Sequence, residues 1–199
     1  MRSLTLICLA ILAMAGAALP VWAASFSLTL DGDRNVPTFT LTNTSGSEQL
    51  TRFLFTIGDP AFGFDFYRNL VPPPGGTVVI SAPDTGNQDG LFSEAIDVAF
   101  TGFDPGESFS FEVDVDPVPT GEVVQNFEEV FFNNGLAPSS VITVGFSDGL
   151  TSVISLPDEV PVAASYSFSG EAEIPLPPSL VLMLGGLMGL AFIQRRRWR

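Results

Sequence analysis

Apolar and polar residues alternate with a period of two through the middle of the chain, the pattern of β-strands with one buried face. The clearest case is residues 109–116, where two phenylalanines and two valines alternate with one serine and three acidic residues. The same pattern predicts strands at residues 25–30, 38–42, 51–57, 62–66, 77–81, 95–103, 141–147, 151–156 and 163–170. Runs rich in Gly, Pro, Asp and Asn separate these strands and predict turns.

Short strands at this spacing predict an all-β fold: a single antiparallel β-sandwich, either jelly-roll-like or immunoglobulin-like. The exception is residues 122–134, which predict a helix. Val123, Phe127, Val130 and Phe131 keep to one helical face there, and Gly135 suits the C-terminal cap.

The motif F-T-x-x-D-P-x-x-x-F-x-F occurs twice, at residues 55–66 and 100–111. Each copy predicts a strand, an Asp-Pro turn and a second strand with alternating phenylalanines. Proline fixes φ after a turn-forming aspartate, so we attribute the repeated motif to reuse of the same turn chemistry. Duplication of a hairpin is the alternative.

The first residues have the order of a secretory signal peptide. A positive start at Arg2 is followed by an apolar run at residues 4–19 and by small residues around Ala23. This order predicts cleavage after Ala23, with cleavage after Ala24 and an uncleaved anchor helix as alternatives. The single cysteine, Cys8, lies in the part removed, so the mature protein enters an oxidising compartment without disulfides.

The last residues predict a short transmembrane helix whose C-terminal end is cytoplasmic. The apolar run at residues 176–193 has 18 residues. At 1.5 Å per residue it spans about 27 Å, the lower limit for crossing a bilayer. The positive-inside rule keeps the arginine cluster after it on the cytoplasmic side. That basic tail consists of Arg195, Arg196, Arg197 and Arg199.

A proline-rich motif precedes this helix, and its residues are Ile174, Pro175, Leu176 and Pro177. Such a motif, one apolar helix and a terminal arginine cluster resemble the PEP-CTERM sorting signal. The motif is most similar to the VPLPA-type variant, with Ile in the place of Val and Pro178 where Ala is usual. The resemblance covers residues 174–199 and implies a Gram-negative exported protein. It also implies that an exosortase, a membrane cysteine protease, cuts the chain near the motif and delivers it to the cell surface or extracellular matrix. A plain single-pass anchor is the alternative, which would leave a periplasmic protein in the inner membrane.

Three segments follow from these patterns: a signal peptide at 1–23, one acidic β-sandwich domain at 24–173 and a sorting signal at 174–199. The domain holds all 22 acidic residues and three of the eight arginines, a net charge of −19 that repels nucleic acid and anionic membranes. The chain has no histidine and no lysine. This excludes Ser-His-Asp and Cys-His nucleophile systems, imidazole metal ligands, Schiff bases and the P-loop lysine.

Carboxylates are therefore the candidate functional groups. Glu112, Asp114 and Asp116 lie on one face of the strand at 109–116, with neighbours about 7 Å apart. We expect a solvated acidic face. The alternative is a Ca²⁺ site completed by a loop acid such as Asp59 or Asp104. Residues 31–35, Asp-Gly-Asp-Arg-Asn, imitate the start of an EF-hand loop but lack its later Gly and bidentate Glu, so we exclude an EF-hand.

We expect a non-enzymatic cell-surface or extracellular-matrix protein with no cofactor other than Ca²⁺ as a candidate. Its expected partners are the secretion machinery, an exosortase, the membrane through the C-terminal helix before processing, and extracellular polysaccharide as a further candidate. A ligand-binding or Ca²⁺-binding adhesion module is the alternative. A carboxylate pair can hydrolyse glycosides, but the domain has no Trp and only Tyr67 and Tyr166 to stack on sugar rings, so we do not expect an enzyme.

Overall fold

The computed structural model describes residues 23–32, 35–82, 92–118, 126–132, 139–158, 160 and 163–172. The signal peptide before Ala23, the sorting motif, the expected transmembrane helix and the basic tail lie outside the described residues. Within the described part of the chain, no helix has the length and apolarity needed to cross a bilayer.

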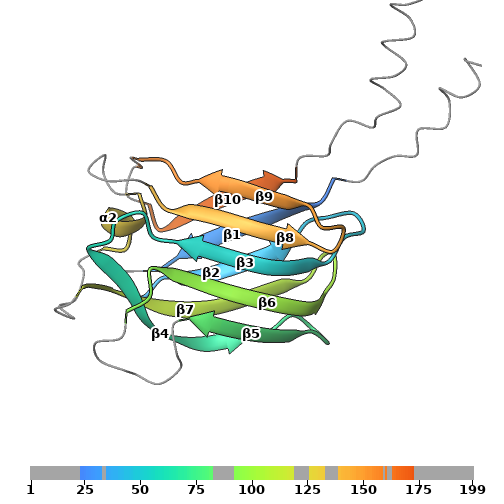
Figure 1. Ribbon diagram of the computed structural model, residues 1–199, viewed down its shortest axis with the longest axis horizontal. Helices are drawn as coiled ribbons and strands as arrows, with labels where there is room; N and C mark the ends of the chain where they lie inside the picture. Colours follow the sequence, from blue (N-terminus) through green and yellow to red (C-terminus); the bar gives the residue numbers. More distant parts are fainter. Residues whose placement is uncertain are drawn as a thin grey trace, which may run out of the picture.

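Two five-stranded antiparallel sheets pack face to face, which confirms the expected antiparallel β-sandwich (Figure 1). The first sheet has the order β10-β1-β2-β7-β4, with bounds Ser165–Glu171, Ser25–Asp31, Thr38–Asn43, Ser108–Pro117 and Phe62–Val71. The second has the order β5-β6-β3-β8-β9, with bounds Thr77–Ala82, Ala95–Phe103, Leu50–Thr56, Val141–Phe146 and Thr151–Ser155. Every strand predicted from the period-two pattern is present, and β4 is the one that runs well beyond its predicted end.

The core lies between the sheets and is built mainly from phenylalanine. Phe39 of β2 stacks on Phe111 of β7 in the same sheet, with ring centroids 5.1 Å apart. It also meets Phe55 of β3 in the opposite sheet edge-on, at 5.2 Å. Phe131 packs on Phe55 with ring centroids 4.7 Å apart and closes one end of the sandwich. Alternating aromatic positions therefore point inward from both sheets, as the period-two pattern requires.

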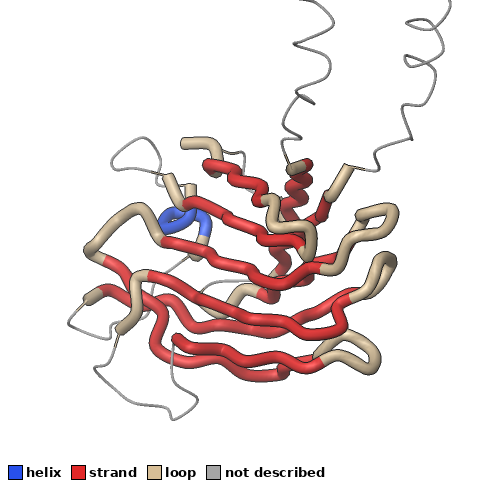
Figure 2. Tube along the Cα trace, turned by 45° about the vertical axis from the view of Figure 1, so that its right-hand side comes forward, coloured by secondary structure: helices blue, strands red, loops and turns tan. Residues whose placement is uncertain are grey.

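The helix expected over residues 122–134 is confirmed only in part. In the described residues it is a single turn, α2 (Glu128–Phe131), at one end of the sandwich, drawn blue in Figure 2. Residues 122–125 and 133–135, with Val123 and the expected glycine cap, lie outside the described residues. Phe127 takes the N-cap position, and it has no side-chain oxygen to accept an orphan backbone N–H, so no side-chain cap forms. The expected apolar face is nevertheless buried at Phe127, Val130 and Phe131.

The two copies of the F-T-x-x-D-P motif are not hairpins. The first joins β3 to β4 and the second joins β6 to β7, and each passes from the second sheet to the first. Both turns close in the same way, because the Asp59 carbonyl accepts from the Phe62 N–H at 3.1 Å and the Asp104 carbonyl accepts from the Glu107 N–H at 3.2 Å. This supports reuse of one turn chemistry, here at the crossings between sheets.

Candidate functional site: a buried carboxylate cluster

The acidic row of β7, which consists of Glu112, Asp114 and Asp116, becomes more buried along the strand. Glu112 is partly exposed and forms an ion pair with Arg68 of β4, with Nε and Oε2 2.7 Å apart. Asp114 and Asp116, further along the same face, are only 8% and 6% exposed. The expectation of a solvated acidic face is therefore wrong for these two residues. They lie on the face of the first sheet that points away from the core, yet water is excluded from both.

A β-bulge in β4 brings a third carboxylate into the same region. β4 and β7 pair regularly up to Phe64, and pairing resumes where Tyr67 lies opposite Val113. Between these points β4 has one residue more than β7, so Asp65 sits in a bulge opposite the Asp114 position. Bulges re-aim side chains and often occur beside functional sites.

Asp65, Asp114 and Asp116 together form the cluster. Each offers a carboxylate oxygen, and these oxygens lie within 4.8 Å of one another. In a regular antiparallel pair, directly opposed like charges are destabilising, and burial makes the repulsion stronger. The cluster is thus a concentrated negative charge in a place that is poor in water.

The segment before β2 reaches the cluster from the other side of β7. The backbone carbonyls of Asn35 and Pro37 accept from the N–H groups of Val115 and Val113 at 2.9 and 3.2 Å. This pairing extends the β2 edge past its first residue and places Asn35 beside the carboxylates. Its side-chain amide Nδ2 donates to Asp114 Oδ1 at 2.6 Å. β7 therefore lies between an aspartate on β4 and an asparagine on the segment before β2.

Burial and mutual repulsion raise the pKa of both β7 aspartates. Burial raises the pKa of Asp114 to about 7 with help from the charges of Asp116 and Asp65, while the Val115 N–H and Arg68 act in the opposite direction. Burial and the charge of Asp65 raise the pKa of Asp116, and a hydrogen bond from Asn35 opposes this. One oxygen, Asp116 Oδ1, is buried and accepts no hydrogen bond. Most buried polar atoms in proteins have a partner, so this oxygen needs an explanation.

The fold brings together only some of the carboxylates that the sequence suggested as metal ligands. Asp114 and Asp116 come together, whereas Glu112 is occupied by Arg68. The loop acids do not join them: Asp59 Oδ1 accepts from the Ala61 N–H at 2.9 Å within its turn. Asp104 Oδ1 accepts from the Gln49 side-chain amide at 2.6 Å.

Sequence reasoning missed Asp65 and Asn35. The signal for Asp65 was its place between two alternating phenylalanines of the motif at residues 55–66, on the polar side of a predicted strand. Asn35 is the last residue of the incomplete EF-hand pattern at residues 31–35, and it reaches the carboxylates through a different arrangement. Neither could be joined to Asp114 without knowing that β4 and the segment before β2 flank β7.

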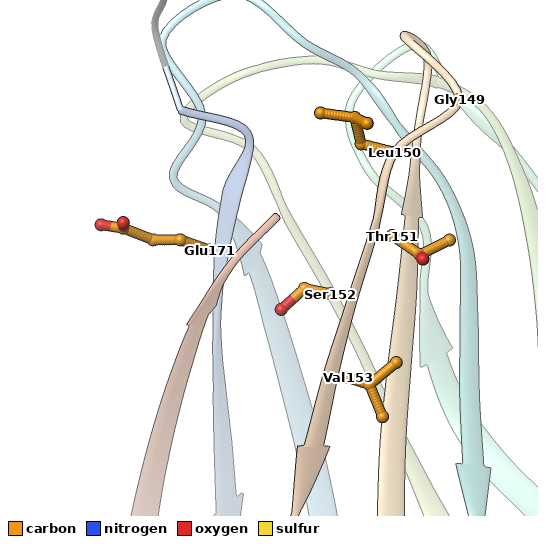
Figure 3. Close-up of a pocket in the computed structure, with 6 residues that line it drawn as sticks. All are labelled: Gly149, Leu150, Thr151, Ser152, Val153 and Glu171. Carbon is orange, nitrogen blue, oxygen red and sulfur yellow. The ribbon is translucent and has the colours of Figure 1, made fainter. Parts of the chain in front are cut away.

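A separate hollow of about 500 Å³ lies between the start of β9 and the end of β10. It is lined by Gly149, Leu150, Thr151, Ser152, Val153 and Glu171 (Figure 3). Glu171 points away from Ser152 and is the single carboxylate of the lining. The hollow therefore does not hold the pair of acids that glycoside hydrolysis uses.

The fold and the cluster define the protein as an antiparallel β-sandwich with a buried acidic site on the outer face of one sheet. Comparisons of the chain with protein-family models, with curated proteins and with solved structures gave no match.

Proposed function

We propose that this protein is an exported, non-enzymatic component of the cell surface or extracellular matrix, sorted there by its C-terminal signal. The order of signal peptide, acidic domain, proline-rich motif, apolar helix and arginine cluster supports the proposal. Its partners before processing are the secretion machinery, the membrane and an exosortase. Extracellular polysaccharide is the candidate partner after processing, and nucleic acid is excluded by the charge of the domain.

The single observation in the fold that carries the proposal is the pairing of the first strand with the last. Ser25 of β1 lies opposite Glu171 of β10. The Ala172 N–H then donates to the Ala24 carbonyl at 2.8 Å. The folded domain is thus closed between the signal cleavage position and the sorting motif. Both processing segments can be removed without breaking a strand.

This closure also favours one signal cleavage position. Ala24 is 1% exposed and its carbonyl holds Ala172. Cleavage after Ala23 leaves this residue in the fold, whereas cleavage after Ala24 removes a buried side chain and one backbone hydrogen bond. We therefore propose that the mature chain begins with Ala24.

Intact mass and cell fractionation of the native protein test the proposal, in cells with and without their exosortase. We expect a mature species that begins at Ala24, lacks the arginine cluster and reaches the surface or medium only when the enzyme is present. Replacing Pro175 and Pro177 by alanine should block that step. The matched control replaces Pro72 and Pro74, two exposed prolines of the domain, and should leave sorting unchanged.

A protein that keeps Arg195–Arg199 and stays in the inner membrane in both strains would overturn the sorting proposal. It would instead identify the tail as a membrane anchor and the protein as periplasmic. Loss of sorting in the control variant would show that misfolding, not motif recognition, controls delivery.

A further inference from the structure

We propose that Asp65, Asp114 and Asp116 bind one Ca²⁺ ion on the outer face of the first sheet, with Asn35 orienting Asp114 through its amide hydrogen bond. This inference concerns the folded domain and does not depend on how the chain is sorted.

The buried oxygen of Asp116 is the observation that points to a ligand. Asp116 is more than nine-tenths buried, and its Oδ1 accepts no hydrogen bond. Leaving a carboxylate oxygen dehydrated and unpartnered is costly. Its carboxylate also contributes to the cluster in which the oxygens of three aspartates lie within 4.8 Å of one another. A cation placed among these oxygens supplies the missing partner.

The charges around the cluster favour a cation over a neutral polar ligand. Arg68 is the positive side chain that acts on Asp114, but its guanidinium is already paired with Glu112. The hydrogen bond that Asp114 receives from Asn35 comes from a neutral amide. Buried charges in proteins are normally paired or bound to a metal, so a divalent cation satisfies the site more completely than a neutral molecule.

The donor set and its spacing favour Ca²⁺ among divalent cations. All donors are oxygens, and the chain has no histidine to attract zinc or copper. Ca²⁺ binds oxygens at about 2.3–2.6 Å, so two ligands on opposite sides of the ion are about 4.6–5.2 Å apart. The three carboxylate oxygens, which lie within 4.8 Å of one another, can therefore all reach one Ca²⁺ ion. Mg²⁺ demands near-ideal octahedral geometry and gives up its bound water reluctantly, so three aspartates in a place poor in water suit it less well than Ca²⁺.

Bound Ca²⁺ would join two strands that are distant in sequence and would strengthen their contact with a third segment. Asp65 belongs to β4, the strand at one end of the first sheet, which pairs with β7 and forms a single further bridge between Phe64 and Ser93. Asp114 and Asp116 belong to β7, and Asn35 belongs to the segment before β2. An ion held between β4 and β7 fastens β4 to the sheet in a domain without disulfides.

Calcium titration of the full chain in detergent tests the inference. After chelation with EGTA, calorimetry should give one Ca²⁺ per chain. At a Ca²⁺ concentration about a hundredfold above Kd, the thermal midpoint should rise by about 5–10 °C. Mg²⁺ at the same ionic strength should give a much smaller rise.

Amide substitutions identify the ligands. Asp116→Asn and, separately, Asp65→Asn should lose the Ca²⁺-dependent rise and weaken binding at least tenfold. Glu112→Gln is the matched control, because it removes one negative charge from the same face of β7 but lies outside the cluster. It should bind Ca²⁺ as the wild type does. Far-UV circular dichroism in EGTA establishes that each variant is folded.

Three results would overturn the inference. The first is a wild-type protein whose midpoint is the same in EGTA and in Ca²⁺. The second is an equal response to Mg²⁺, which would mean that the acidic surface is only being screened. The third is a folded Asp116→Asn variant that binds Ca²⁺ as well as the Glu112→Gln control.

Discussion

Replacing Asp114 by asparagine is expected to stabilise the cation-free protein at pH 8 and to have little effect near pH 4. The side chain is buried, and its pKa is raised from an ordinary value of 3.8 to about 7. Ionising it in the folded state is therefore unfavourable compared with ionising it in the unfolded chain. Asparagine keeps the shape and can still accept the hydrogen bond from Asn35, but it carries no charge.

The magnitude follows from the difference between the two pKa values. A pKa of about 7 against 3.8 corresponds to about 4 kcal/mol of destabilisation once the folded carboxyl is ionised. Because the folded pKa is the higher one, the folded protein binds more protons than the unfolded chain between these values. Wild-type stability should therefore fall as the pH rises from about 4 to 7. The destabilisation from ionised Asp114 is complete well above pH 7 and absent below about pH 4. Allowing for imperfect packing of the amide, we expect Asp114→Asn to gain about 2–4 kcal/mol at pH 8.

Urea unfolding at pH 4, 6 and 8, with EGTA throughout, measures the effect. The groups that face Asp114 are Asp116 on its own strand, Asp65 and Arg68 on β4, and Asn35 before β2. Asp116 titrates with Asp114 as a coupled pair, so the wild-type stability curve should be broad rather than a single-site transition.

Asp97→Asn is the matched control, and its expected effect on the free energy of unfolding at pH 8 has the opposite sign. A side-chain hydrogen bond from Arg52 is the main reason that the pKa of Asp97 is lowered. A lowered folded pKa contributes stability that is present above the unfolded value and lost as the pH falls through the folded value. The control should therefore destabilise at pH 8, by at most about 1 kcal/mol for an exposed pair. An Asp114→Asn variant that is less stable than the wild type at pH 8, or equally shifted at pH 4 and 8, would contradict the buried-charge interpretation.

Three further substitutions test the packing, each by urea unfolding at pH 7. Asn43 is fully buried, and its Nδ2 donates to the carbonyls of Glu48 and Phe103 at 2.8 and 3.0 Å. Asn43→Ala should therefore cost about 2–4 kcal/mol, because it removes both of these hydrogen bonds. Phe55→Ala should cost about 3–5 kcal/mol because it opens a cavity in the aromatic core, and a loss below 1 kcal/mol would mean that the core rearranges. Gly76→Ala should cost at least about 1 kcal/mol, because its Cβ would lie 2.8 Å from the backbone oxygen of Gly102; unchanged stability would show that this turn moves freely.

Much of the fold could be predicted because strand formation is a local property. The alternation of Phe109, Phe111, Val113 and Val115 with polar residues marks β7 without any knowledge of its neighbours. Turn residues mark most ends. The predicted end of β4 was wrong because its last residues are exposed and irregular, and bulges there break the period of two. The predicted helix is confirmed at Glu128–Phe131, and the rest of its predicted range lies largely outside the described residues.

The sequence predicted only those residues of the candidate site that lie on a single strand, β7. The sequence by itself determined the acidic row of β7, the absence of histidine and the charge of the domain. Only the tertiary structure decided that Asp114 and Asp116 are buried and that Glu112 is paired with Arg68 instead. It also decided that Asp65 completes the cluster and that Asn35 lies beside it. Burial and strand neighbours depend on which segments pair across the sheet, and here the partners of β7 lie far away in sequence. A bulge of one residue, which no periodicity reveals, then sets the position of the third carboxylate.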